Sequence, residues 1–346
     1  MYKAQGKIGL FDNQFVKQQL KDMGNPLEAV SKVVDFEMFR SLLEDKLLNT
    51  NKKNNAGAKP FDVVLMFKIM FIQRYYNLSD NQAEYQIIDR LSFKIFLGLE
   101  SGDKVPDEKT IWAFREKLTD MGLVEDLFDL FGQQLKEKGL IFNEGKILDA
   151  SFTEVPRQRN TREENKQIKE DNGDELWNDQ PNKKSHKDTD ARWTKKNGQN
   201  FYGYKDHVKI GIKHKLIETY LVSDASVHDS KALGSLISEE DENQPLYADS
   251  AYTGPNQEQA ISDCDMINQV CEKGHRNLPL TAQQQDSNKA KSKIRARVEH
   301  VFGFMEQSMK GLFIRSIGLV RATAIIGLIN LTYNIFRYEQ LMRGIC

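Results

Sequence analysis

The sequence has little cysteine. Its 346 residues contain three, Cys264, Cys271 and Cys346, and none of them forms a CxxC pair. Three cysteines cannot all be joined in disulfides, which suits a protein of the reducing cytosol. A zinc site built from Cys264, Cys271 and His275 is disfavoured because the spacing matches no standard zinc knuckle and a fourth ligand is missing.

Signals for secretion or membrane insertion are also missing. The first 15 residues, MYKAQGKIGLFDNQF, lack the apolar stretch of a signal peptide. The longest apolar run, Ala322–Phe336, is interrupted by Asn330, Thr332 and Asn334 and is too short to span a bilayer. We therefore expect a soluble intracellular protein with no membrane partner, in which a C-terminal helix over Gly318–Leu341 packs on the core.

Motifs for several kinds of enzyme chemistry are absent. The chain has neither a P-loop nor the glycine motif of a dinucleotide-binding protein. No arrangement of Ser, His and Asp, or of Cys and His, indicates a side-chain nucleophile. A uniformly basic surface is absent too, because the formal net charge is −1. From Glu272 to Arg321, however, ten Lys and Arg residues oppose four Asp and Glu residues, so any polyanion-binding surface is regional.

The composition is that of a globular protein with more than one domain. Hydrophobic residues make up 39% of the chain and aromatic residues 10%, and 346 residues exceed the usual size of one domain. From about residue 25 to residue 140, apolar residues recur at intervals of three and four, whereas a pattern without helical period begins at Lys146. The predicted fold class is α+β, with a helical domain in residues 1–140 and an α/β domain with a mixed sheet in residues 141–346.

The helical domain ends in a segment typical of DNA-binding helices. Ser79 is a suitable N-cap for one predicted helix, and Asp107 for a second, shorter one. A helix, a tight turn and a second helix with Lys109 and Arg115 near its start would make a helix-turn-helix motif, in which these two residues contact DNA. The alternative is an ordinary helical bundle whose last helix carries a few charges.

Two carboxylates occupy strand positions in the second domain. Lys146 begins a predicted strand that contains Asp149, and a buried carboxylate there needs a partner or a metal ion. A short strand, Leu246–Ala248, ends at Asp249, where the chain turns toward a helix, which is a usual location for an active-site group. The alternative for Asp149 is an Asp at a strand end that caps a turn. A hairpin over Phe201–Val222 would lie beside the first strand. A helix over Ser230–Ser238, with Asp229 as a plausible cap, would follow the hairpin, and one more strand would cover Met266–Cys271.

A polar insertion at about residues 157–200 separates the first strand from the hairpin. It has almost no apolar residues, which indicates a long, mobile segment with one helix near Arg162–Lys169. Trp193 lies in this insertion beside several basic residues. It could stack on nucleic-acid bases, and an anchoring role in a loop is an equally good interpretation.

A third carboxylate, Glu299, follows the basic cluster Lys289–Arg297. If Lys289–Phe304 is one helix, Lys291, Arg295 and Glu299 share a face. One interpretation is an ion pair between Arg295 and Glu299 on a solvated face. The other makes Glu299 a metal ligand while the basic residues contact phosphates. The basic residues concerned are Lys289, Lys291, Lys293, Arg295 and Arg297.

Together, Asp149, Asp249 and Glu299 would suit Mg²⁺, with Mn²⁺ able to substitute. Hard oxygen ligands in small number leave room for waters and phosphate oxygens around this ion. Two such ions about 3.5–4 Å apart would activate the attacking oxygen and stabilise the leaving oxygen in phosphodiester displacement. This chemistry needs no side-chain nucleophile, in agreement with the absence of one.

A series of segments occurs in a characteristic order along the chain. They are KPFDVVLMFKIMFIQRYYNLSD, RLSFKIFLGLE, VPDEKTIWAFREKL, ILDASF, ARWTKKNG, FYGYKDHV, VHDS, YADSAY and RARVEHVFG. The carboxylates within them are separated by 249−149 = 100 and 299−249 = 50 residues. In this order and spacing the chain, from about Lys59 to Gln340, resembles the DDE transposases of bacterial insertion sequences, specifically the insertion-sequence-five type.

The resemblance implies a ribonuclease-H-like catalytic domain, in which the first and fourth strands lie side by side and Asp149, Asp249 and Glu299 ligate the metal. It implies cleavage that frees the 3′ ends of the element, followed by attack of the 3′-OH groups on target DNA. Arg295, in the family's Arg-x-x-x-Glu pattern, would contact DNA near the active site. The partners would be double-stranded DNA, namely the terminal inverted repeats and the target, and a second copy of the chain in a homodimer. The protein would be bacterial, cytoplasmic and associated with the nucleoid.

Two positions depart from the family pattern. Ser292 stands where a Tyr is often found, and Glu306 where a Lys is often found, so Lys310 would have to supply the positive charge at that end of the helix. Two other functions stay open. One is a DNA-binding derivative without catalysis, which the intact carboxylates argue against. The other is a ribonuclease-H-like nuclease that cuts DNA without strand transfer.

Overall fold

The computed structural model describes residues 12–48, 59–100, 102–170, 172–196, 198–275 and 278–344. The chain forms two compact units. The helical unit takes in Met1–Gln73, Leu78–Lys117 and Tyr338–Cys346, and the sheet unit takes in Arg74–Asn77 and Leu118–Arg337. The sheet unit therefore begins earlier in the sequence than the change of periodicity at Lys146, and the last residues of the chain belong to the helical unit.

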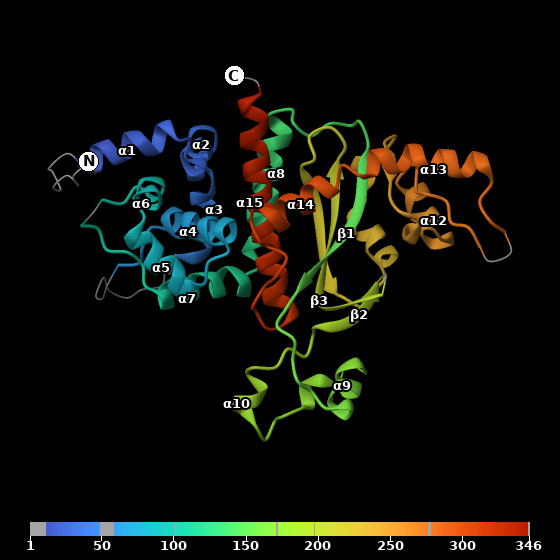
Figure 1. Cartoon of the computed structure of the whole chain (residues 1–346), viewed down its shortest axis with the longest axis horizontal. Helices are drawn as coiled ribbons and strands as arrows, with labels where there is room; N and C mark the ends of the chain where they lie inside the picture. Colours follow the sequence, from blue (N-terminus) through green and yellow to red (C-terminus); the bar gives the residue numbers. More distant parts are fainter. Residues whose placement is uncertain are drawn as a thin grey trace, which may run out of the picture. The chain divides into compact units, whose positions relative to one another are not determined.

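Short helices around an aromatic core build the helical unit (Figure 1). Phe36, Phe39, Phe67 and Phe96 are each at most 4% exposed. The rings of Phe36 and Phe96 meet edge to face with their centroids 5.5 Å apart, a favourable aromatic geometry. The helices are α1 (Asp12–Asp22), α2 (Pro26–Val33), η1 (Phe36–Phe39), α3 (Arg40–Leu47), α4 (Val63–Tyr76), α5 (Asp80–Asp89), α6 (Leu91–Leu97) and α7 (Glu108–Asp120).

Two of these helices begin at the caps that the sequence predicts. Ser79 precedes α5, where its hydroxyl accepts a hydrogen bond from Gln82 N and its own N–H donates to the Gln82 side chain, both at 3.2 Å. This reciprocal arrangement is a capping box. Asp107 accepts a hydrogen bond from Thr110 N at 2.7 Å at the start of α7. Both predicted caps are confirmed.

Removal of the Ser79 cap should destabilise the helical unit. We expect Ser79→Ala to lower the free energy of unfolding by about 1 kcal/mol, because the backbone N–H of Gln82 loses its acceptor. Denaturant unfolding of the full chain measures the effect. Ser41→Ala, an exposed serine on α3, serves as the control and should change little. Equal stability of the two variants would contradict the capping role.

One six-stranded mixed sheet organises the sheet unit. Five strands follow the order β2-β3-β1-β5-β6, and β4 pairs with β3. β1 runs antiparallel to β3 and parallel to β5. The strand that contains Asp149 (β1) and the strand that precedes Asp249 (β5) were predicted to lie side by side, and their pairing confirms this. The fold is ribonuclease-H-like. The strands are β1 (Lys146–Glu154), β2 (Arg192–Lys196), β3 (Gln199–Gly211), β4 (Ile217–Asp224), β5 (Pro245–Tyr247) and β6 (Ile267–Asn268).

Helices cover the two faces of this sheet. Figure 1 shows α8 and α15 on one side of the strands and α12 on the other. Leu148 of β1 packs into a core cluster with Leu233, Leu236, Tyr252 and Ile261 from the segments on the α12 side. The helices are α8 (Leu123–Glu137), α9 (Arg162–Lys169), η2 (Gly173–Glu175), α10 (Pro181–Lys184), η3 (Asp229–Ala232), α11 (Leu233–Leu236), η4 (Glu239–Asp241), η5 (Ser250–Tyr252), α12 (Pro255–Asp263), α13 (Ala282–Arg295), α14 (Glu299–Gln307) and α15 (Leu319–Arg343).

The C-terminal helix α15 is a core element. Its length and composition would allow it to cross a membrane, but 78% of its most apolar 18-residue stretch is buried inside the protein. Two of the polar residues that interrupt its apolar run, Asn330 and Asn334, bond to strands of the sheet, whereas Thr332 donates to Leu328 O of its own helix. Asn334 accepts a hydrogen bond from Ile217 N at 2.9 Å and donates one to Ile217 O at 2.7 Å, which fixes the helix on β4. The expected packing of this helix on the core is confirmed.

The polar insertion forms a small lobe with its own secondary structure (Figure 1). α9 confirms the helix expected at Arg162–Lys169. Trp177 is 6% exposed within the lobe, and its Nε1 donates to Glu164 at 2.7 Å. Trp193 lies on β2 opposite Tyr202 of β3. The expectation of Trp193 in a loop is therefore wrong, because residues 192–196 extend the sheet.

Two elements after the hairpin are shorter than the sequence predicts. The helix expected over Ser230–Ser238 consists of the single turns η3 and α11. Its N-cap is His228, whose side chain accepts from Ser230 N, and the expectation of Asp229 as the cap is wrong because that side chain faces inward to Lys205. The strand expected over Met266–Cys271 is the two-residue β6.

Candidate active site

Asp149 lies inside the sheet unit on the fourth residue of β1. Its Oδ1 accepts a hydrogen bond from Ala150 N at 2.8 Å, and its Oδ2 lies 2.9 Å from the Nη1 of Arg295. Burial raises the pKa of Asp149, and the nearby Asp249 carboxylate raises it further, whereas the hydrogen bond and Arg295 act in the opposite direction. The charge of ionised Asp149 therefore costs free energy in this buried position, and the Arg295 guanidinium offsets only part of that cost.

Asp249 lies two residues beyond the end of the neighbouring strand, β5. β1 and β5 are paired in parallel at Ile147 and Tyr247, and each Asp follows two residues later. Its carboxylate accepts from Ala251 N at 2.8 Å, which caps η5 as the chain leaves the sheet. Parallel strands thus bring two carboxylates together at one edge, as the sequence predicts for this α/β layer.

Glu299 has a different environment from the one predicted. The expected single helix over Lys289–Phe304 is broken, because α13 ends at Arg295 and α14 begins at Glu299. In the turn between them, Val298 N and Glu299 N donate to carbonyls only three residues back. Glu299 is exposed at the first position of α14, and its expected pairing with Arg295 is replaced by the contact of Arg295 with Asp149.

The three predicted metal ligands are consequently not gathered into one cluster. Within the described ranges, no group of three or more His, Cys, Asp and Glu side chains is close enough to hold one metal ion. The structure brings together Asp149, Asp249 and Arg295, and leaves Glu299 apart from them. Arg295, and not Glu299, is the charged residue that lies beside Asp149.

Tyr252 is a site residue that the sequence analysis missed. It is 1% exposed, and its hydroxyl has no hydrogen-bond partner in the described part of the chain. Burial raises the pKa of Tyr252 well above its ordinary value, and the carboxylates of Asp149, Asp229 and Asp249 add to this effect. The sequence could have pointed to Tyr252, because it stands three residues after the predicted ligand Asp249 in YADSAY. The unpaired hydroxyl therefore lies near three carboxylates.

Asp229 is buried and forms ion pairs, whereas the sequence predicted that it caps a helix. It is 8% exposed and pairs with the ammonium of Lys205 at 2.7 Å and, more distantly, with Lys196 at 3.8 Å. His207, on the same strand as Lys205, bonds to the Ser223 hydroxyl at 2.8 Å. Burial lowers the pKa of His207 to about 4, so this imidazole is neutral at physiological pH. These residues form a polar layer beneath the carboxylates.

The predicted DNA-binding residues differ in their surroundings. Arg115 forms a bidentate ion pair with Asp80, at 2.5 and 2.8 Å, within the helical unit. Its guanidinium therefore stabilises the fold of this unit. Lys109 is exposed on α7, and Trp193 is 45% exposed on β2, where its ring lies 4.9 Å from that of Tyr202.

The basic cluster of α13 is likewise only partly available. Lys289 pairs with Asp286 at 2.9 Å, Lys291 donates to Val270 O at 3.1 Å, and Lys293 is exposed. Arg297 donates to Ile212 O at 3.1 Å. Among these residues, Lys293 presents its charge to solvent most directly.

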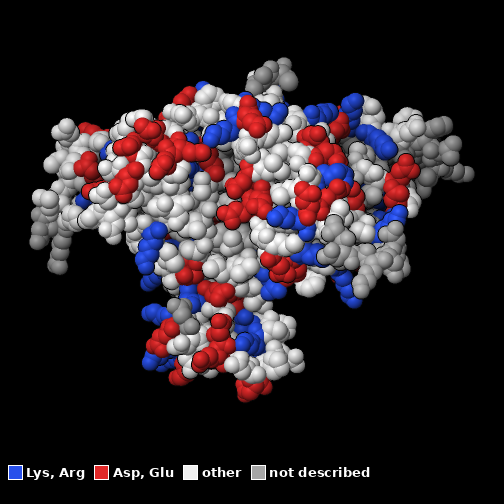
Figure 2. Space-filling model, turned by 180° about the vertical axis from the view of Figure 1, so that it is seen from behind, with Lys and Arg blue, Asp and Glu red and all other residues white. Residues whose placement is uncertain are grey.

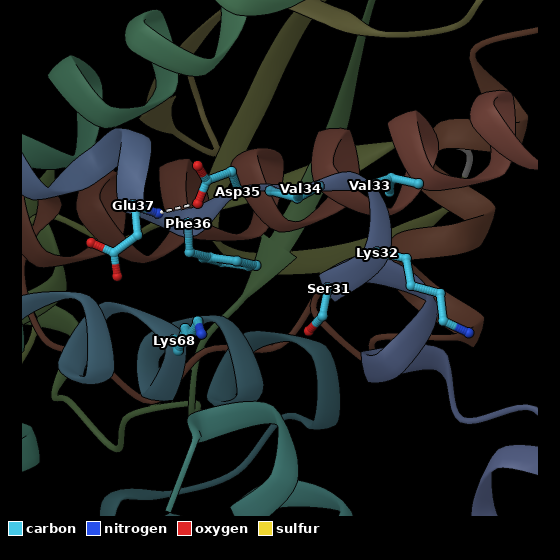
Figure 3. A pocket seen from close by; sticks show the side chains of 8 residues that line it. All are labelled: Ser31, Lys32, Val33, Val34, Asp35, Phe36, Glu37 and Lys68. Carbon is cyan, nitrogen blue, oxygen red and sulfur yellow. Dashed lines mark hydrogen bonds between the residues drawn. The ribbon is translucent and has the colours of Figure 1, made fainter.

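A hollow in the helical unit carries no excess charge of either sign (Figure 3). Its lining includes two bases, Lys32 and Lys68, and two acids, Asp35 and Glu37. The Lys68 ammonium lies 5.5 Å from the ring centroid of Phe36, and burial lowers its pKa. Figure 2 shows acidic and basic side chains interspersed on one face of the molecule. Neither view reveals a continuous basic surface.

A comparison with known families identifies the family to which this chain belongs. Residues 142–335, more than half of the chain, match the family described as Transposase DDE domain. The chain belongs to the DDE transposase family. Residues 15–117 of this DDE transposase match a second description, Transposase domain (DUF772). Members of the DDE family use divalent metal ions.

A solved structure is also similar to this DDE transposase. It is the piggyBac transposase in a synaptic complex with hairpin DNA, at 10% sequence identity and a TM-score of 0.46. The similarity covers 94% of this chain and 78% of that chain.

Proposed function

We propose that this DDE transposase moves an insertion sequence of the insertion-sequence-five type. It binds the terminal inverted repeats, cleaves DNA at the element ends and joins the 3′-OH ends to target DNA. The observation that carries the proposal is the parallel pairing of β1 with β5, which sets Asp149 and Asp249 each two residues after the paired residues Ile147 and Tyr247. Two adjacent carboxylates at a strand edge are a typical platform for a divalent cation.

The donors around Asp149 fit Mg²⁺, and Mn²⁺ would substitute. Burial and the charge of Asp249 both make ionised Asp149 costly, and a divalent cation would relieve that cost. In this proposal Asp149 and Asp249 hold the metal, and Glu299, which the structure leaves apart from them, joins them when the metal is bound. When bound, the metal supplies Lewis-acid activation of the attacking oxygen and stabilisation of the leaving oxygen.

The other residues of the site orient these groups. Arg295 keeps the Asp149 carboxylate in position and adds positive charge next to the scissile phosphate. The unpaired hydroxyl of Tyr252 donates a hydrogen bond to an oxygen that enters the site. The Lys205–Asp229 pair supports the floor of the site from β3.

The proposed DNA-binding domain is the helical region, residues 1–140, and the proposed catalytic domain is residues 141–346. Lys109 on the exposed side of α7 and Lys293 on α13 supply phosphate contacts. Two element ends must be held together during transposition, so the active complex is a homodimer. The protein acts in the bacterial cytoplasm, at the nucleoid.

Incubation with DNA tests this function. The full chain, Mg²⁺ or Mn²⁺ and a DNA bearing the inverted repeats that flank its coding region should yield joined products. Omission of the divalent ion should abolish them while DNA binding persists. Cleavage without joining would favour a ribonuclease-H-like nuclease, and binding with neither step would favour a DNA-binding derivative.

A further inference from the structure

A basic hollow lies in the sheet unit, outside the carboxylate site. Three segments line it: residues 155–158 after β1, residues 186–188 before β2 and residues 315–317 before α15. The first and third segments are held together where Glu154 N donates to Leu312 O and Ile314 N donates to Glu154 O, both at 2.9 Å. The hollow is therefore built from distant parts of the sequence on a sheet framework.

The lining of the hollow is positively charged because it contains three bases, Arg157, Lys187 and Arg315, and one acid, Asp188. Asp188 is 1% exposed, and its carboxylate accepts hydrogen bonds from the Tyr204 hydroxyl at 2.8 Å and from the N–H groups of Asp190 and Ala191 at 3.0 Å. These contacts come from three donors, and none of the three is a base of the lining. The Asp188 carboxylate forms no ion pair with the described basic residues of the lining, so it does not hold their charges.

The bases of the lining lack close carboxylate partners in the part of the chain that the structure describes. Arg157 is 63% exposed and lies 3.9 Å from Glu154, at the limit of an ion pair. Lys187 donates only to neutral oxygens, at 2.6 and 2.7 Å. Arg315 is exposed, and its guanidinium lies 5.5 Å from the ring centroid of Phe313. The lining therefore carries three bases, Arg157, Lys187 and Arg315, against the single acid Asp188, and among these described bases only Arg157 has a carboxylate, that of Glu154, within 4 Å.

Two buried polar atoms in the same lining also lack partners. The Ser316 hydroxyl and the Gln158 Oε1 are buried and make no hydrogen bond among the described residues. Buried polar groups are normally paired, so the unpaired Ser316 hydroxyl indicates a ligand that accepts hydrogen bonds, whereas the Gln158 oxygen would need a donor. A phosphodiester, whose single negative charge is shared by two non-bridging oxygens, suits guanidinium and hydroxyl donors together.

We propose that this hollow binds a backbone phosphate of the DNA that occupies the active site. The inference rests on the proposed function. The chain stays extended from Asp149 to Val155, whose N–H still bonds to Tyr202 O. Six residues of strand span roughly 20 Å, and at about 3.4 Å per base pair this distance corresponds to about six base pairs. The proposal places the DNA along β1, so that the bound phosphate lies about six base pairs from the one that is cut.

Phosphate ethylation interference and salt-dependent binding test the proposal. The full chain, without divalent metal, is titrated against a duplex that carries one element end. We expect Arg315→Gln and Arg157→Gln each to weaken binding about tenfold at low salt and to reduce the slope of log K against log salt by about one. Ethylation of a phosphate about six base pairs from the cleavage site should weaken binding of the wild type but not of Arg315→Gln.

Lys136→Gln is the matched control, since it removes one exposed charge on α8 that does not line the hollow. It should keep both the wild-type slope and the interference pattern. Equal melting temperatures show that the variants are folded. If Arg315→Gln retains the wild-type slope and interference, the hollow is not a phosphate site, although the proposed function stands. A wild-type protein that binds no DNA overturns both.

Discussion

Replacement of Asp149 by Asn will reduce cleavage and joining of DNA ends by at least about 10³-fold, since loss of a metal-ligating carboxylate removes roughly 4 kcal/mol of transition-state stabilisation. The Asn side chain preserves the size of the carboxylate but not its charge. Burial already makes that charge costly, as the raised pKa of Asp149 shows, so the variant will fold at least as stably as the wild type. Loss of activity will therefore not be caused by unfolding.

The measurement is a single-turnover assay with labelled element ends, run beside a DNA-binding titration and a thermal melt. Asp249→Asn and Glu299→Gln should show the same loss of activity. Asp263→Asn, an exposed carboxylate at the end of α12, is the matched control and should retain activity. Retention of joining by Glu299→Gln with loss in the two Asp variants would remove Glu299 from the metal site.

The second large effect concerns the buried acid Asp206 on β3. It is 2% exposed, and its Oδ1 accepts a hydrogen bond from Asn330 Nδ2 at 3.1 Å. Burial raises the pKa of Asp206 to about 7, against an ordinary value of 3.8. Asn330 Oδ1 is buried without a partner among the described residues.

The sign of the pH dependence follows from the raised pKa. Between pH 3.8 and about 7 the folded chain holds a proton that the unfolded chain has lost, so stability falls as pH rises through this window and is level above it. A shift of this size corresponds to about 4 kcal/mol. Asp206→Asn keeps the hydrogen bond and needs no proton. It will therefore be more stable than the wild type at pH 8, by up to that amount.

Denaturant unfolding of the full chain at a series of pH values gives the difference between the wild type and Asp206→Asn. This difference should rise from pH 4 to pH 7. Asn330→Leu is the second variant, and because the hydrogen bond from Asn330 lowers the pKa of Asp206, its removal should move the fall in stability to higher pH. A difference that does not vary with pH would show that Asp206 is ionised in the folded protein at all these values.

Local elements of this DDE transposase were predictable because their causes are local. Ser79 and Asp107 cap helices through hydrogen bonds to backbone groups three residues away. Strand β1 could be located from its apolar pattern, and Asp249 from the turn that follows β5. The break between α13 and α14 was missed because helical spacing reports only on nearby residues. It carries no information about the contact of Arg295 with Asp149, which is 146 residues away in the sequence.

The sequence by itself determined the fold class, the helix caps, the strand positions of Asp149 and Asp249 and the resemblance to the family. The tertiary structure alone decided the partners of charged groups: Arg295 with Asp149, Arg115 with Asp80, and Asp229 with Lys205. It also assembled the basic hollow from three separate segments. The physical reason is that capping and periodicity act within a few residues, whereas burial and charge pairing depend on which distant segments the folded sheet brings together.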